Sequence, residues 1–218
     1  MAIVELIHPQ SARKDIPVWS EFRMQPKEGP YEEDLPTELF IQQLRRVRST
    51  SPNRLAFIVG AMNNLMDSQT GRMTKEAIAL VKTTDRAATS CGYSCFHCFG
   101  LQDFGRYRVT SQQATLMDRL LVKRSNLFIS LDTTPDSSNA PIETLYRLRL
   151  GGSVIALFKE DNPRPEYREW LSEQVQSGSH TNPLAVFLTY QDLDDLRQEL
   201  TKIADYKYIL SNPYGKAV

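Results

Sequence analysis

Short apolar runs alternate with amphipathic segments from about residue 54 onward. RLAFIVGAM, at residues 54–62, is a continuous apolar run that follows Pro52 and ends in the turn-like GAMNN, which is typical of a buried parallel strand. Similar runs predict further strands at residues 92–99, 127–132, 153–158 and 184–190. Apolar positions at helical spacing predict helices at residues 73–88, 113–126, 140–152 and 191–204, with a short helix ending at Trp170. This alternation predicts an α/β domain of the Rossmann-like or flavodoxin-like kind, with three layers and a parallel sheet of about five strands.

The composition divides the chain into three parts. Residues 1–53 are rich in proline and irregular, apart from a helix-like segment at residues 37–48, and we interpret them as an N-terminal extension packed on the core. Residues 54–160 form the predicted core, and residues 161–218 a C-terminal strand–helix extension of the same domain. A length of 218 residues suits one domain with a sizeable core better than two independent ones.

The charge balance restricts the partners that the chain can attract. The 26 lysine and arginine residues equal the 26 aspartate and glutamate residues, so no field of one sign steers the protein towards nucleic acid or an anionic membrane. The chain has no apolar run of membrane-spanning length, and its first residues lack a signal-peptide pattern. We therefore expect a cytoplasmic protein with no nucleic-acid and no membrane partner.

Two carboxylates are candidates for catalysis. Asp118 is expected on the polar flank of its helix, and Glu143 falls in the first turn of the next one. The exposed N–H groups of a first turn stabilise an anion, which suits Glu143 to act as a nucleophile or electrostatic stabiliser. In the alternative interpretation, Glu143 is an ordinary helix-start residue and Asp118 a solvated residue paired with Arg119 or Lys123.

Three loops are expected to meet at one edge of the sheet. These are GAMNN, the loop after Phe99 and the loop at residues 132–139, because each follows the carboxyl end of a predicted strand, where ligands of such sheets bind. In the last loop, Ser137 and Ser138 precede a helix. They are candidates either for a phosphate site or for simple helix capping.

The three cysteines form a compact motif. Cys91, Cys95 and Cys98 have the C-x3-C-x2-C spacing with which radical S-adenosylmethionine enzymes hold an iron–sulfur cluster. Too few residues follow Cys98 to complete the barrel of those enzymes, and buried thiols are the alternative. A zinc site that includes His97 meets the same objection, because adjacent strand residues point to opposite faces. We expect no metal and no cofactor.

The order of several short motifs between residues 54 and 160 resembles a known family. AFIVGAMN, GYSCFHCFGLQDF, MDRLLVKRSNLFISLD and SSNAPIETLYRLRLGGSVIALFK follow one another as in the nucleoside 2-deoxyribosyltransferase-like family. Among its members, the chain is most similar to the deoxynucleoside 5′-monophosphate N-glycosidases, in which the two carboxylates have nearly the same separation as Asp118 and Glu143.

The resemblance implies a role for each matching residue. Glu143 would attack C1′ of the sugar to give a covalent glycosyl-enzyme and release the base, while Asp118 would position the sugar or protonate the base. The implied substrate-binding residues are Gly60, Ala61, Met62 and Asn63 near the 5′-phosphate, Asp132, Ser137, Ser138 and Asn139 in the loop before Glu143, and Phe96, His97 and Gln102 on the base side.

The resemblance also implies partners. The expected ligand is a small-molecule nucleotide or nucleoside, and the expected assembly is a homodimer or a higher homo-oligomer. Hydrolysis and transfer of the sugar to another base both remain open. A second hypothesis is a non-catalytic nucleotide-binding sensor or interaction module on the same fold.

Overall fold

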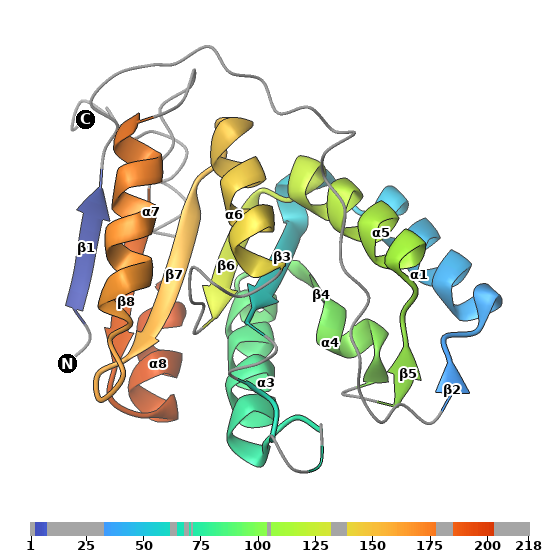
Figure 1. The fold of residues 1–218 in the computed structure, drawn as a ribbon, viewed down its shortest axis with the longest axis horizontal. Coiled ribbons are helices and arrows are strands. Elements are labelled where there is room, and N and C mark those ends of the chain that lie inside the picture. Colours follow the sequence, from blue (N-terminus) through green and yellow to red (C-terminus); the bar gives the residue numbers. More distant parts are fainter. Residues whose placement is uncertain are drawn as a thin grey trace.

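A six-stranded sheet forms the centre of the molecule. This computed structural model describes residues 33–61, 65–67, 70, 72–103, 106–131, 139–177 and 185–202, and the backbone of residues 3–7. The strands are β1 (Ile3–Ile7), β3 (Leu55–Gly60), β4 (Ser94–His97), β6 (Leu127–Leu131), β7 (Val154–Lys159) and β8 (Ala185–Tyr190). Their order is β1-β8-β7-β6-β3-β4, and all neighbours are parallel except β1 and β8 (Figure 1). The predicted parallel sheet of five strands is confirmed.

Helices cover both faces of the sheet. They are α1 (Thr37–Ser49), α3 (Lys75–Ser90), α4 (Cys98–Leu101), α5 (Ser111–Arg124), α6 (Ala140–Arg149), α7 (Pro165–Ser177) and α8 (Leu193–Leu200), with a 3-10 turn, η1 (Pro52–Arg54). Helices α1, α5, α6 and α7 pack on one face, and α3 and α8 pack on the other (Figure 1). This is the predicted three-layer Rossmann-like arrangement. No helix in the described ranges is long and apolar enough to cross a membrane.

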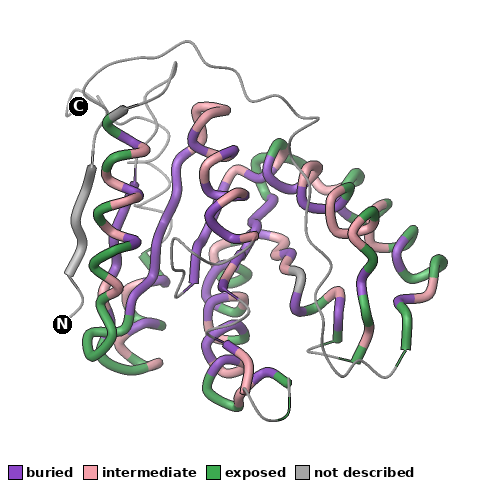
Figure 2. The backbone as a smooth tube through the Cα atoms, viewed as in Figure 1, coloured by how far each residue is buried: buried purple, intermediate pink, exposed green. Residues whose placement is uncertain are grey.

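The continuous apolar runs of the sequence are explained by burial on both faces of the strands. Along β3, Phe57 belongs to the core under α1, α5, α6 and α7, and Ile58 to the core under α3 and α8. Phe57 and Phe128 meet edge to face, with ring centroids 5.5 Å apart. Strands β3, β6, β7 and β8 are accordingly buried along almost their whole length (Figure 2). Because side chains alternate in direction along a strand, only a sheet covered on both sides requires every position to be apolar.

The N-terminal region contributes more to the sheet than the sequence predicts. The expected helix at residues 37–48 is confirmed as α1, but β1 pairs antiparallel with β8, so the prediction that this region is otherwise irregular is wrong for residues 3–7. A two-residue strand, β2 (Glu33–Asp34), also pairs with β5 (Tyr107–Arg108). The pattern of apolar residues could not predict β1, because this short edge strand depends on pairing with β8 near the other end of the chain.

The strand order creates a switch point between β3 and β6. The chain leaves β3 to form β4 on one side, and then returns to form β6 on the other side of β3. Gly60 and Leu131, the last residues of these two strands, lie opposite each other in the register. Ligands of open α/β sheets bind outside the carboxyl ends of the strands at such a point. The end of β6 leads towards α6, the helix that carries Glu143.

Candidate functional site

Both candidate carboxylates are buried. Asp118 in α5 and Glu143 in α6 are each 5% exposed. The expectation that Asp118 lies on a polar flank, and the alternative that it is a solvated residue, are therefore wrong. The physical reason is that α5 packs on the sheet, on α1 and on α6 at once, so its buried arc is wider than the apolar stripe and includes Asp118 beside Met117 and Leu121.

A side chain of α6 fixes the relative position of the two helices. Arg147 donates from Nη1 to the carbonyl oxygen of Val122 (3.3 Å) and from Nη2 to that of Asn126 (3.5 Å), at the C-terminal end of α5. Asp118 precedes Val122 by one helical turn, and Glu143 precedes Arg147 by one turn, which is about 5.4 Å of helix. Both helices run from the carboxyl edge of the sheet to its other edge, so we infer that the two carboxylates lie on facing turns of α5 and α6.

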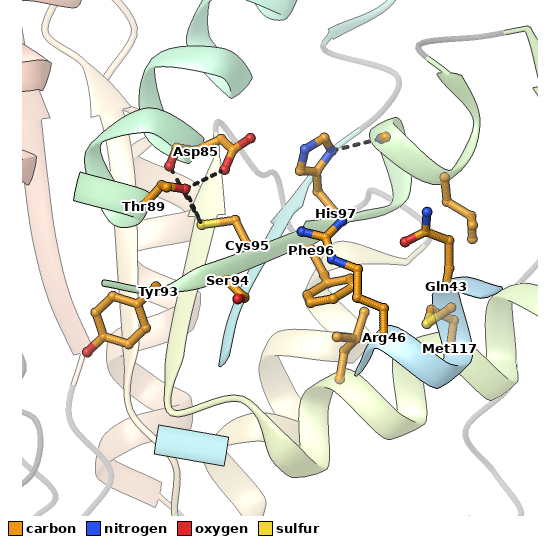
Figure 3. A pocket seen from close by; sticks show the side chains of 13 residues that line it. Gln43, Arg46, Asp85, Thr89, Tyr93, Ser94, Cys95, Phe96, His97 and Met117 are labelled. Carbon is orange, nitrogen blue, oxygen red and sulfur yellow. Dashed lines mark hydrogen bonds between the residues drawn. The ribbon is translucent and has the colours of Figure 1, made fainter. Parts of the chain in front are cut away.

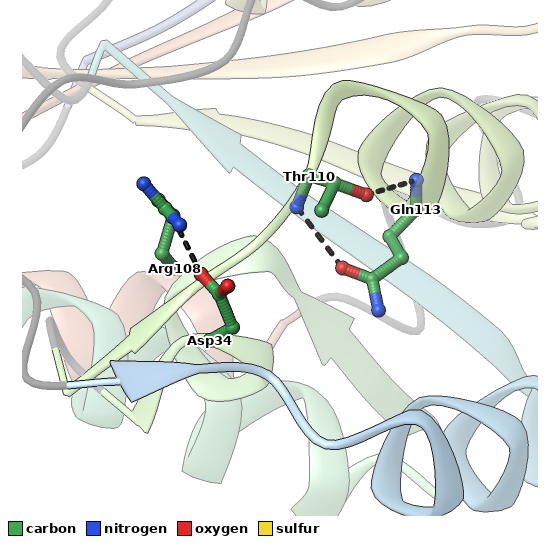
Figure 4. A network of polar contacts seen from close by, with 4 residues as sticks. All are labelled: Asp34, Arg108, Thr110 and Gln113. Atoms are coloured by element: carbon green, nitrogen blue, oxygen red, sulfur yellow. Dashed lines mark hydrogen bonds and ion pairs between the residues drawn. The ribbon is translucent and has the colours of Figure 1, made fainter.

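The start of α5 is fixed by a capping box. Gln113 N donates to Thr110 Oγ1 (3.2 Å), and Thr110 N donates to Gln113 Oε1 (3.0 Å) (Figure 4). Beside it, Arg108 Nε donates to the carboxylate of Asp34, which joins β5 to β2 and lowers the pKa of Asp34. The helix that carries Asp118 therefore has a defined first turn.

The first turn of α6 places Glu143 close to the helix N-terminus. Glu143 N donates to the carbonyl oxygen of Asn139 (3.0 Å), the N-cap residue, and Pro141 lies between them, where a missing N–H costs nothing. The N–H groups of this turn favour an anion nearby. The local sequence thus fixes Glu143 where the helix dipole stabilises a carboxylate, as expected for a nucleophile or an electrostatic stabiliser.

The buried hydroxyls of Ser130, Tyr167 and Thr144 form a chain of hydrogen bonds that ends at the same turn of α6. Thr144 Oγ1 donates to the carbonyl oxygen of Ala140 (2.8 Å), Tyr167 Oη donates to Thr144 Oγ1 (3.1 Å), and Ser130 Oγ lies 3.2 Å from Tyr167 Oη. Each hydroxyl has one proton, so Ser130 is the donor to Tyr167. The chain links β6 and α7 to the residue next to Glu143. Sequence reasoning missed it, because nothing local distinguishes these hydroxyls from ordinary ones.

The glycine loop after β3 is tightly packed where it is described. A Cβ atom on Gly60 would lie 3.0 Å from the Leu65 side chain and 3.1 Å from the Leu131 carbonyl oxygen, and Ala61 is 1% exposed. Close packing thus accounts for the small residues at the end of β3. The other predicted residues in the loops at this edge lie outside the described ranges; they are Met62, Asn63, Asp132, Ser137 and Ser138.

Phe96 and His97, expected together on the base side, point to opposite faces of β4. Phe96 lies under the guanidinium of Arg46 in α1, 4.7 Å from the ring centroid, whereas His97 Nδ1 accepts from Gly100 N (2.8 Å). Both nevertheless line one pocket of about 350 Å³ that surrounds the free edge of β4 (Figure 3). Burial lowers the pKa of His97, so its imidazole is neutral near pH 7.

Gln102 lies close to this region but does not line the pocket. It is 6% exposed, and its Oε1 accepts no hydrogen bond from any residue in the described ranges. Its backbone oxygen accepts from Tyr107 N (2.9 Å), which connects α4 to β5.

The side chains of Cys91 and Cys95 do not point towards a common site. Cys91 Sγ donates to the carbonyl oxygen of Thr201 (3.7 Å), and Cys95 Sγ donates to that of Asp85 (3.7 Å). Burial raises the pKa of the Cys95 thiol to about 12, and a protonated thiol is a poor metal ligand. The side chain of Cys98 lies outside the described residues. Among the described side chains, no group of three or more His, Cys, Asp or Glu residues is placed to hold a metal ion.

A second pocket, of about 650 Å³, lies at the carboxyl ends of β7 and β8. The N-termini of α3 and α8 border it, but their first turns are already capped by side chains. Ala77 N donates to Thr74 Oγ1 (3.1 Å), and Asp194 N and Asp195 N donate to Asp192 Oδ1 (2.9 and 2.8 Å). These side chains already occupy N–H groups of both first turns that an anionic ligand would otherwise bind.

The comparisons with known proteins establish the fold. No protein-family model and no curated protein matches the chain in sequence. Among solved structures, the chain is similar to the solution structure of BlsM, with a TM-score of 0.57 and 16% sequence identity, over 78% of this chain and 99% of BlsM. At this identity the similarity supports the α/β fold alone. The resemblance to the nucleoside 2-deoxyribosyltransferase-like family stays a prediction.

Proposed function

We propose that the protein cleaves the N-glycosidic bond of a nucleoside 5′-monophosphate or nucleoside, with Glu143 as nucleophile and Asp118 as its partner. The observation that carries this proposal is the burial of both carboxylates, each 5% exposed, on neighbouring helices. A buried carboxylate is costly unless the structure compensates it, so two of them on helices that pack together are more consistent with a reaction site than with solvated surface residues.

In the proposed reaction, the Glu143 carboxylate attacks C1′ and the bond from C1′ to the base nitrogen breaks. The electron pair of that bond goes to the base, which takes a proton from Asp118 or from water. Water then attacks C1′ of the glycosyl-enzyme and gives a proton to the Asp118 carboxylate, or to solvent where water protonated the base; the ester to Glu143 breaks, and its carboxylate is regenerated. If another base replaces water in the second step, the same site performs transfer.

Three features of the fold support the assignment. Glu143 lies in the first turn of α6, where the helix N-terminus stabilises the carboxylate needed for attack. The switch point between β3 and β6 is the edge at which sheets of this kind bind ligands. The bond from Arg147 to Val122 holds the two carboxylate-bearing helices at a fixed spacing, as a two-carboxylate mechanism requires.

The test is a screen for released base. The protein is incubated with nucleoside 5′-monophosphates and with the matching nucleosides, and free base is detected by chromatography. We expect release from at least one of them, abolition by Glu143→Gln, and normal activity for Glu173→Gln, which changes an exposed glutamate of α7. Base release by Glu143→Gln at the wild-type rate overturns the role of Glu143. Nucleotide binding without base release by the wild type favours a non-catalytic sensor.

A further inference from the structure

The hydroxyl chain of Ser130, Tyr167 and Thr144 joins the sheet to the first turn of α6. Its members lie on three different elements, β6, α7 and α6, and Tyr167 is 37 residues from Ser130 and 23 from Thr144 along the sequence. Tyr167 and Thr144 are fully buried, and Ser130 is 1% exposed. The chain ends at the carbonyl oxygen of Ala140, the first residue of α6. It therefore connects one helical turn to two elements that are distant in the sequence.

The surroundings of these hydroxyls are apolar. The Tyr167 ring packs against Phe158 and Trp170, with ring centroids 6.0 and 5.3 Å away, and belongs to the core under α6 and α7. Apolar side chains of the same shape could replace all three hydroxyl-bearing residues at little cost in stability. Hydrogen bonds nevertheless fix distances and directions that apolar packing leaves adjustable. The hydroxyl chain is therefore better suited to fix the position of α6 than to raise stability.

The turn that the hydroxyl chain contacts also carries Glu143. Thr144 follows Glu143 directly, so the two side chains leave the helix axis about 100° apart. On another side of α6, Arg147 donates to the backbone of Val122 in α5. Hydrogen bonds to both α7 and α5 restrict the rotation and the sliding of α6. Such movements would displace the Glu143 carboxylate, and a displacement of about 1 Å can reduce the rate of a reaction by about 10²-fold.

We propose that Tyr167 and Thr144 are positioning residues that hold the Glu143 carboxylate in the orientation for attack on C1′. Because this role depends on the proposed cleavage reaction, replacement of either hydroxyl should lower kcat and leave KM almost unchanged. The loss should be largest for Thr144→Val and smaller for Tyr167→Phe. It should be smallest for Ser130→Ala, because Tyr167 still donates to Thr144 in that variant.

A triple variant separates positioning from stability. Tyr167→Phe alone takes a partner from two buried hydroxyls, whereas Ser130→Ala/Tyr167→Phe/Thr144→Val leaves none of the three in place. The triple variant should recover most of the urea midpoint that Tyr167→Phe loses. With the nucleotide or nucleoside that the wild type cleaves best, its kcat should stay about tenfold or more below that of the wild type, with KM within about twofold. Recovery of kcat together with stability overturns the positioning role, and so does a rise in KM with kcat unchanged.

Thr84 of α3 provides the matched control. Its buried Oγ1 donates to the carbonyl oxygen of Leu80 (2.9 Å), the same bond that Thr144 makes to Ala140, but on the other face of the sheet. Thr84→Val should retain the wild-type kcat. Thr144→Ser should recover the kcat that Thr144→Val loses, although it lacks a buried methyl group and should unfold at a lower urea concentration.

The same assays distinguish failure of the positioning role from failure of the proposed function. A wild-type kcat in Thr144→Val overturns the positioning role alone, as does an equal loss of kcat in Thr84→Val. A wild type that releases no base from any nucleoside 5′-monophosphate or nucleoside overturns the proposed function, and the positioning role with it.

Discussion

A hydrogen bond joins the side chain of Arg147 in α6 to the backbone of Val122 in α5. Arg147 Nη1 lies 3.3 Å from the Val122 oxygen, one helical turn beyond Glu143 and Asp118 respectively. Arg124 of α5 makes a similar contact with the neighbouring helix α1, because its Nη2 donates to the carbonyl oxygens of Arg48 (3.2 Å) and Thr50 (3.0 Å) at the end of that helix. Each arginine thus satisfies carbonyl groups at the C-terminal end of a helix that packs beside its own.

Replacement of Arg147 by methionine should lower the activity and leave the free energy of unfolding almost unchanged. Burial lowers the pKa of Arg147 from 12.5 to about 10, which corresponds to a desolvation cost of about 3 kcal/mol. Two long hydrogen bonds to carbonyl groups contribute a similar amount, so we expect Arg147→Met to change the free energy of unfolding by no more than about 1 kcal/mol. The proposed base release should nevertheless fall at least tenfold, because the helix that carries Glu143 loses these two bonds to the C-terminal end of α5.

The matched control is Arg149→Met in the last turn of the same helix, which makes neither of the two hydrogen bonds of Arg147 and should retain full activity. Urea unfolding and the base-release assay provide the two measurements. A loss of more than about 3 kcal/mol in Arg147→Met would show that the arginine is mainly a structural group.

Tyr167→Phe should remove the hydrogen bonds of the Tyr167 hydroxyl to Ser130 and Thr144, next to Glu143, without creating a cavity. The ring keeps its contacts with Phe158 (centroids 6.0 Å apart) and Trp170 (5.3 Å), while the buried hydroxyls of Ser130 and Thr144 lose their shared partner. We expect a loss of about 1 to 3 kcal/mol of unfolding free energy. Hydrogen exchange of the amides at residues 140–146 should quicken more than that of β8.

A double-mutant cycle with Thr144→Val checks the origin of this effect. Contacting residues show a coupling energy of about 0.5 to 3 kcal/mol, whereas independent sites add within about 0.5 kcal/mol. Additive losses in the double variant would mean that the Tyr167 and Thr144 hydroxyls do not act through each other.

The order of the elements could be predicted from the sequence, but the environment of the carboxylates could not. The helix expected at residues 73–88 is α3 at Lys75–Ser90, and the strand expected at residues 184–190 is β8, because both depend on local apolar periodicity. The burial of Asp118 depends on α1 and α6 packing on either side of α5. Tyr167 meets Ser130 across 37 residues of chain, and no local pattern encodes such a contact.

Removal of the α5 capping box should have a modest and local effect. Thr110→Ala deletes the hydroxyl that accepts from Gln113 N and frees the Gln113 side chain, so we expect a loss of about 1 kcal/mol. Gln112→Ala, at an exposed position of the same first turn, should stay within about 0.5 kcal/mol of the wild type. Thermal unfolding of the two variants provides the comparison, and equal stability of both would show that the box does not stabilise α5.

The Cys95 thiol should make stability depend on pH in the alkaline range. Burial raises its pKa from 9.0 to about 12, so the folded state binds the proton more tightly than the unfolded state. The resulting stabilisation is complete below pH 9 and is lost progressively as the pH rises from 9 towards 12. The same shift keeps the thiol protonated at pH 8, so iodoacetamide should modify Cys95 slowly until the chain is unfolded. Cys95→Ala should lose less stability between pH 9 and 11 than the wild type, as followed by urea unfolding. Rapid alkylation of native Cys95 at pH 8 would contradict the burial that shifts its pKa.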